Sequence, residues 1–141
     1  MRVASRMFVL ILSLLLCIGG SIAFADAPLQ YTLGDKINDF SFHTYGGEKI
    51  TLSEVLQKKD AVLINIWATW CGPCRKVVPI VEEIAKERSD IKVGKINVDE
   101  QPELAAQFGV MSIPTLVVMK DGKIVTQSAG ARPKNAILAM L

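Results

Sequence analysis

The sequence predicts an α/β fold with a mixed central β-sheet that is flanked by helices, and three observations lead to it. The run Ala61–Trp67 is almost entirely apolar, which is typical of a central strand buried on both faces. The segment Trp70-Cys71-Gly72-Pro73-Cys74 follows it, and residues 75–89 then show helical periodicity. The remaining segments alternate between strand-like and helix-like patterns. This order indicates a layered α/β domain.

The first structured elements are expected to form an N-terminal β-hairpin and a short helix. Residues 40–44 alternate in polarity, a Tyr45-Gly46-Gly47-Glu48 turn follows, and residues 49–52 return as a second strand. The segment Thr51-Leu52-Ser53-Glu54 fits a capping box, in which Thr and Glu satisfy the first backbone N–H groups of a helix. We therefore expect a short helix through Leu56.

The C-terminal elements follow from apolar patterns and turn residues. Pro79 should kink the helix at residues 75–89, and Asp121-Gly122 should turn the last two strands into a hairpin. Gly130 ends that hairpin. The expected elements are a strand at 91–98, a helix at 102–108, strands at 115–119 and 123–127, and a final helix from Pro133 to Leu141.

Residues 1–25 have the pattern of a secretory signal peptide. Arg2 and Arg6 precede an apolar run over residues 7–18, and Ala23-Phe24-Ala25 offers the small residues that a signal peptidase requires. Cleavage is thus expected before Asp26. Residues 26–39 then form a tether or irregular lead-in, and residues 40–141 form the domain.

Two alternatives for the N-terminus stay open. The apolar stretch is marginally long enough to remain as a membrane anchor. A lipoprotein modified at Cys17 is the other alternative, although Leu16 stands where a lipobox has a small residue. Each of the three predicts a location outside the cytoplasm, in the periplasm or on the extracytoplasmic face of the membrane. Disulfide bonds persist in such compartments.

Charge and cysteine content limit the function classes. The formal net charge is +2, and loss of residues 1–25 removes Arg2 and Arg6 and leaves acidic and basic residues in balance. Because phosphate binding needs a basic excess, we expect no nucleic-acid partner. Of the three cysteines, Cys17 lies in the N-terminal apolar run, so the domain keeps only Cys71 and Cys74. This pair suits redox chemistry or metal binding.

Thiol–disulfide exchange is the chemistry that the local pattern favours. A helix that begins at the pair offers free N–H groups and the positive end of its dipole, which stabilise a thiolate at Cys71. A closed zinc site needs four ligands, which one pair does not supply, and the lone His43 is distant in sequence. We expect no metal.

Residues 40–141 resemble the thioredoxins. The motifs that carry the resemblance are Trp70-Cys71-Gly72-Pro73-Cys74, Pro79, Ile113-Pro114-Thr115 and Gly130, with residues 93–99 similar to the third strand of the family. The resemblance implies a thioredoxin fold and a redox-active Cys71–Cys74 disulfide with no further cofactor. It implies that Cys71 is the nucleophile and Cys74 the resolving thiol. It also implies a cis Pro114 and a substrate surface that includes Trp70, Gly72, Pro73, Ile113, Pro114 and Gly130.

The N-terminal part of the domain is similar to exported thioredoxin-like proteins of cytochrome c maturation. With Gly72-Pro73 between the cysteines, the resemblance implies a monomeric reductase of protein disulfides outside the cytoplasm. Its partners would be disulfide-bearing proteins and an upstream dithiol donor in the membrane. A disulfide oxidase or isomerase is the first alternative, because the direction of exchange depends on potential and partner. A binding or assembly module with incidental redox activity is the second.

One departure from the family concerns the proton of the second thiol. Thioredoxins usually place a buried Asp six residues before the first Cys, and Asn65 stands there in this chain. Because Asn cannot act as a base, we expect a slower resolving step or a changed pH dependence, with water, Lys95 or another group accepting the proton. Lys95 is either part of a buried proton network or a surface lysine. Trp67, Met111 and Met119 are expected to pack, and His43 to have no catalytic role.

Overall fold

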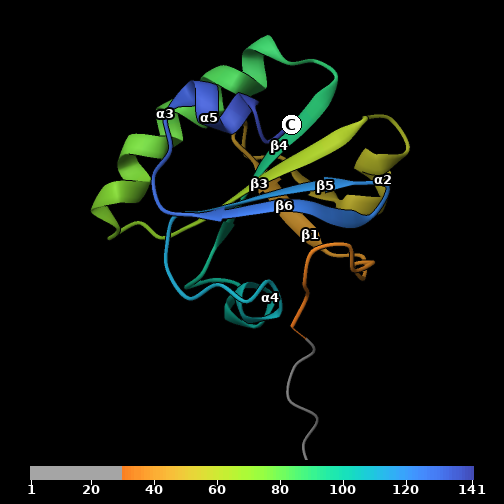
Figure 1. Ribbon diagram of the computed structural model, residues 1–141, viewed down its shortest axis with the longest axis horizontal. Coiled ribbons are helices and arrows are strands. Elements are labelled where there is room, and N and C mark those ends of the chain that lie inside the picture. The colour runs from red at the N-terminus through yellow and green to blue at the C-terminus, as the bar shows by residue number, and fades with distance from the viewer. Residues whose placement is uncertain (1–29) are drawn as a thin grey trace, which may run out of the picture.

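The computed structural model describes residues 30–141 as a six-stranded sheet with the strand order β2-β1-β4-β3-β5-β6 (Figure 1). The predicted signal segment, residues 1–25, and the first four residues of the lead-in lie outside the described residues. β3 is central; it runs parallel to β4 and antiparallel to β5, which confirms the mixed sheet. The strands are β1 (Ser41–Thr44), β2 (Lys49–Thr51), β3 (Ala61–Trp67), β4 (Ile91–Asn97), β5 (Thr115–Lys120) and β6 (Lys123–Ala129).

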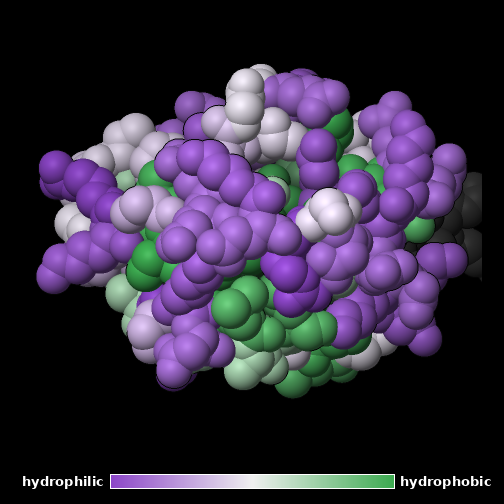
Figure 2. Space-filling model, turned by 90° about the horizontal axis from the view of Figure 1, so that it is seen from above, coloured by the Kyte–Doolittle hydropathy of each residue, from purple (hydrophilic) through white to green (hydrophobic). Residues whose placement is uncertain are grey.

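The helices lie on both sides of the sheet, with α3 and α5 on one side and α4 on the other (Figure 1). Their bounds are α2 (Leu52–Leu56), α3 (Gly72–Glu87), α4 (Pro102–Gln107) and α5 (Lys134–Leu138). Figure 2 views the molecule from above in the orientation of Figure 1. Most of that surface belongs to hydrophilic residues, with a smaller hydrophobic area between them.

Helix α3 begins three residues earlier than its periodicity predicts. The apolar stripe starts only at Val77, whereas the first turn is made by Gly72, Pro73 and Cys74. Pro73 suits this turn because backbone N–H groups at the start of a helix have no acceptor within the helix, so the missing N–H of proline breaks no helix hydrogen bond. The Cys71 side chain accepts a hydrogen bond from the backbone N–H of Cys74. The helix continues through Pro79 to Glu87.

Local signals explain most other boundaries. Both bonds of the predicted capping box, between Thr51 and Glu54, are present. Asp121 and Gly122 both have positive φ, 52° and 74°, as a two-residue hairpin turn requires. The final helix is shorter than expected, from Lys134 to Leu138, and Pro133 is its N-cap residue.

Two apolar layers cover the faces of β3. Val62, Ile64 and Ile66 belong to the layer on the α4 side, and Leu63 belongs to the layer beneath α3. All four side chains are fully buried, as the apolar run predicts. Successive strand residues point to opposite faces, so Asn65 lies on the α3 side with Leu63.

The described part of the lead-in, residues 30–39, is irregular and packs on the domain. The centre of the Tyr31 ring lies 5.8 Å from that of the Phe108 ring. The backbone N–H of Tyr31 donates to the carbonyl of Gln107 at 2.6 Å. The N–H of Gly34 donates to the carbonyl of Ile124 at 2.8 Å. The predicted domain start at residue 40 therefore leaves out a segment that contacts the domain. Within residues 30–141, no helix has the length and hydropathy to cross a bilayer.

Candidate active site

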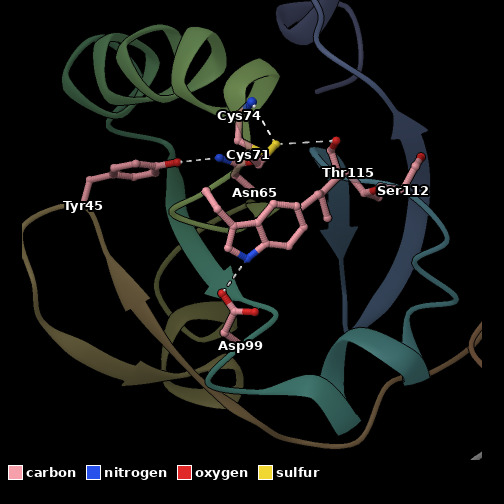
Figure 3. The surroundings of a disulfide bond; sticks show 9 residues. Tyr45, Asn65, Cys71, Cys74, Asp99, Ser112 and Thr115 are labelled. Carbon is pink, nitrogen blue, oxygen red and sulfur yellow. Dashed lines mark hydrogen bonds between the residues drawn. A yellow bond between two sulfur atoms is a disulfide. The ribbon is translucent and has the colours of Figure 1, made fainter.

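Cys71 and Cys74 form a disulfide at the N-terminus of α3 (Figure 3). Cys71 is the N-cap residue, and its Sγ accepts a hydrogen bond from the backbone N–H of Cys74 at 3.1 Å. The two cysteines differ in access, because Cys71 is 5% exposed whereas Cys74 is fully buried. Cys71 is therefore the cysteine that a substrate can approach.

The start of α3 favours negative charge on Cys71. The helix is 16 residues long, and its first turn contains no acidic side chain that would oppose a thiolate. Free N–H groups and the helix dipole stabilise an anion at this end and lower the pKa of a cysteine thiol there, for which thioredoxin itself is a standard example.

The loop before β5 faces the disulfide. The Ile113–Pro114 peptide is cis, as the resemblance implies, and the carbonyl oxygen of Ile113 lies 3.7 Å from Cys71 Sγ. The hydroxyl of Thr115 donates to the carbonyl of Ser112 at 2.6 Å. The N–H of Gly130, whose φ is +88°, donates to the carbonyl of Pro114 at 2.8 Å. The structure thus places Ile113 beside Cys71 and Gly130 against Pro114.

Trp70 flanks an open groove next to the disulfide. Its side chain is 65% exposed, and its Nε1–H donates to Asp99 at 3.0 Å. The groove has a volume of about 400 Å³ and is lined mainly by apolar side chains, among them Val98, Met111 and Ile113. Met111 is 97% exposed, so the expectation that it packs in the interior is wrong. It belongs to the surface beside the cis-Pro114 loop.

The other predicted substrate residues and packing residues have clear positions. Gly72 and Pro73 are exposed in the first turn of α3. Met119 is fully buried in the core, as expected. Trp67 is partly buried and packs against the cluster that contains both cysteines. His43 lies in β1, opposite Lys95 of β4.

Asn65 has a hydrogen-bond partner that the sequence did not indicate. Its fully buried Nδ2 donates to the hydroxyl of Tyr45 at 2.9 Å (Figure 3), whereas its Oδ1 has no hydrogen-bond partner among the described residues. Burial raises the pKa of Tyr45 well above its ordinary value; the charge of Glu82 adds to this, and the Asn65 hydrogen bond opposes it. Tyr45 lies in the turn after β1, and its sequence context signals only a turn.

The burial of Lys95 lies between the two alternatives, a buried member of a proton network and a surface lysine. The side chain is half-buried, and its Nζ lies 5.4 Å from the centre of the Tyr45 ring and 5.7 Å from that of Trp67. These distances suit cation–π contacts. In the parallel pairing of β3 and β4, Lys95 is the partner of Asn65. Lys95 thus borders the polar pair of Tyr45 and Asn65.

Residues 30–141 contain no group of three or more His, Cys, Asp or Glu side chains that could hold a metal ion. In thiol–disulfide exchange the sulfur atoms of the disulfide themselves carry the electrons.

Comparisons with known proteins agree with this geometry. The Thioredoxin family model matches residues 48–141. Thioredoxin 1 of Synechococcus elongatus is 52% identical over 85 residues, which cover 60% of this chain and 79% of the relative. A Mycobacterium tuberculosis thioredoxin is 47% identical over 107 residues, which cover 75% and 84%.

Solved structures show the same fold. A mutant thioredoxin from Halobacterium salinarum aligns with a TM-score of 0.59 at 36% identity, covering 70% of this chain and 83% of that one. Oxidized mitochondrial thioredoxin 3 from Saccharomyces cerevisiae aligns with a TM-score of 0.56 at 31% identity, covering 62% and 82%. The chain therefore belongs to the thioredoxin family, and it is a protein-disulfide reductase whose redox-active group is the disulfide of its Cys-x-x-Cys motif.

Proposed function

We propose that Cys71 is the nucleophile and Cys74 the resolving thiol. In the reduced protein, the Cys71 thiolate attacks one sulfur of a substrate disulfide and forms a mixed disulfide, and the other substrate sulfur leaves as a thiolate. Cys74 then loses its proton and attacks Cys71 Sγ, which releases the second substrate thiolate and restores the Cys71–Cys74 bond. The observation that carries the assignment is the difference in access between the two cysteines.

The substrates are proteins with an accessible disulfide, docked in an extended conformation over the Pro114 loop. The backbone of Ile113 beside Cys71 can pair with such a segment as an added strand would. The apolar groove between Trp70 and Met111 offers room for neighbouring side chains. We expect the protein to act as a monomer, because each chain contains the complete site.

An insulin reduction assay tests this function. With dithiothreitol as the electron source, the wild-type chain should accelerate the reduction of insulin, and Cys71→Ser should abolish the acceleration. Cys74→Ser should form a mixed disulfide but fail to turn over. Activity of Cys71→Ser at the wild-type level would contradict the assignment and would favour the binding-module alternative. An oxidase would instead form disulfides in a reduced protein faster than it removes them.

We propose further that the protein acts outside the cytoplasm. Support comes from residues 1–25, with Arg2, Arg6 and the apolar run, and from the similarity of its N-terminal part to exported thioredoxin-like proteins. None of the relatives and solved structures named above is described as exported, so the sequence alone carries this proposal. An exported reductase needs a supply of electrons across the membrane, and we therefore propose a membrane-bound dithiol donor.

Cell fractionation with N-terminal sequencing tests the location. We expect the protein in the exported fraction, with Asp26 as its first residue. Leu14→Arg, which places a charge in the apolar run, should retain the protein in the cytoplasm. Recovery of wild-type protein from the cytoplasm with Met1 in place would contradict export.

A further inference from the structure

A second hollow lies near the disulfide, and it shares no lining residue with the apolar groove at Trp70. Its volume is about 390 Å³. The lining comes from β1, β3, β4 and the loops after β3 and β4, and it includes His43, Trp67, Thr69, Lys95, Asn97 and Glu100. Most of these side chains are polar or charged. We call this feature the Lys95 hollow.

The Lys95 hollow is close to the cysteine that a substrate approaches. Thr69, an exposed residue of its lining, precedes Cys71 by two residues, so their Cα atoms are at most about 7.6 Å apart. Trp67, another lining residue, packs against the cluster that contains Cys71. A substrate disulfide held at Cys71 therefore places neighbouring side chains of the substrate within reach of this hollow.

The charge of Lys95 has no counterion in the described part of the chain. Its half-buried ammonium group lies against the rings of Tyr45 and Trp67, at 5.4 Å and 5.7 Å from their centres. Among the described residues it forms no ion pair with a carboxylate. Glu100, the acidic residue of the lining, instead accepts a hydrogen bond from Asn97 Nδ2 at 3.2 Å. Because less water screens a half-buried charge, this cation attracts an anion more strongly than an exposed lysine does.

We propose that the Lys95 hollow binds an acidic side chain of the protein substrate, and that Lys95 selects this side chain through its charge. The proposal rests on the reduction of protein disulfides through Cys71 described above. The rings of Tyr45 and Trp67 hold the ammonium group in place, so an entering carboxylate meets a cation that is already positioned. The Thr69 hydroxyl can donate a hydrogen bond to the same carboxylate.

The occupant is a side chain of the substrate rather than a free carboxylate. A single ammonium group binds a free carboxylate weakly, whereas a carboxylate on a chain already attached at Cys71 has a high effective concentration. An extended segment advances about 3.3 Å per residue, so side chains two to four residues from the substrate cysteine begin about 7–13 Å from it. The separation of Cys71 and Thr69 corresponds to the near end of this range.

Two synthetic peptides that differ only in charge test the proposal. Each is a disulfide-linked dimer of a peptide with one cysteine, and it carries either Glu or Gln at the third position on both sides of that cysteine. The second-order rate constant for oxidation of the reduced full chain by each peptide is measured by acid quenching and mass spectrometry. The wild-type chain should react about fivefold faster with the Glu peptide.

Substitutions at Lys95 should change this preference. Lys95→Gln should bring the ratio of the two rate constants close to one, and Lys95→Arg, which keeps the charge, should retain the preference. Lys92→Gln is the matched control, because it removes the same charge from the same strand, where Lys92 pairs with Glu48 at 3.6 Å outside the hollow. This control should retain the fivefold ratio.

The ratio separates binding in the hollow from the other roles that a lysine can have. Equal rates with the two peptides in the wild-type chain would overturn the proposal. So would a fivefold ratio that persists in Lys95→Gln while both rates fall, since Lys95 would then act on the chemistry of the cysteines. An equal loss of preference in Lys92→Gln would also overturn it, because it would show attraction by overall charge. Failure of the wild-type chain to reduce either peptide would contradict the proposed function instead.

Discussion

Trp70→Ala should separate substrate docking from disulfide chemistry. The side chain is 65% exposed, so the roughly one third of its 150–250 Å² that is buried contributes about 1–2 kcal/mol of stability at 25 cal/mol per Å². The exposed hydrogen bond to Asp99 adds about 0.5 kcal/mol. The variant should thus stay folded, with a melting temperature lower by roughly 5–10 °C.

The loss of activity with protein substrates should be larger than this modest loss of stability suggests. Trp70 borders the groove beside Cys71, and an aromatic side chain at the centre of an interface commonly contributes about 2 kcal/mol to binding. For insulin, kcat/KM should fall roughly 30-fold. For a small disulfide such as hydroxyethyl disulfide, which does not fill the groove, the loss should stay below about threefold.

Parallel kinetics with the two substrates check this separation. Asp99→Asn, which keeps an acceptor oxygen for the Trp70 indole, serves as the control and should retain most activity with both. Equal losses with insulin and the small disulfide in Trp70→Ala would refute the docking argument, since they would show that Trp70 acts on the chemistry of Cys71.

Three further predictions concern stability and the loop. Gly94→Ala would force a methyl group into the ring of Phe42 and should lower the free energy of unfolding by about 1–3 kcal/mol in urea titrations, with partial recovery when Phe42→Leu is added. Burial raises the pKa of Tyr45 above its ordinary 10.0, so the unfolded state loses this proton first; stability should fall as pH rises above 10, and the fall should be smaller in Tyr45→Phe. Gly130→Ala, at φ +88°, should cost about 1 kcal/mol or more and reduce insulin turnover by disturbing the bond to Pro114, whereas an unchanged turnover would show that the loop tolerates the strain.

Elements set by local physics could be predicted from the sequence. The apolar run of β3 must be buried on both faces, the capping box closes within Thr51–Glu54, and Asp121-Gly122 accepts the positive φ of a tight hairpin. The start of α3 was harder, because its first turn has no apolar stripe and depends on the cap made by Cys71.

Features that depend on contacts between residues distant in sequence could not be predicted from the sequence. Tyr45 reaches Asn65 across 20 residues of sequence, and only the folded hairpin brings its hydroxyl to β3. Met111 looked like a packing residue, since its apolar side chain carries no signal that the loop would leave it in solvent. The lead-in packs through backbone bonds and the contact of Tyr31 with Phe108, which no periodic pattern marks.

The most direct test of the proposed exchange is to trap the mixed disulfide. The full chain with Cys74→Ser, mixed in reduced form with oxidised insulin, should give a stable covalent adduct, and peptide mass spectrometry should place the bond at Cys71. The Cys71→Ser chain should give no adduct under the same conditions, because Cys74 is fully buried. An adduct at Cys74 in the Cys71→Ser chain, or none at Cys71 in the Cys74→Ser chain, would contradict the assigned roles.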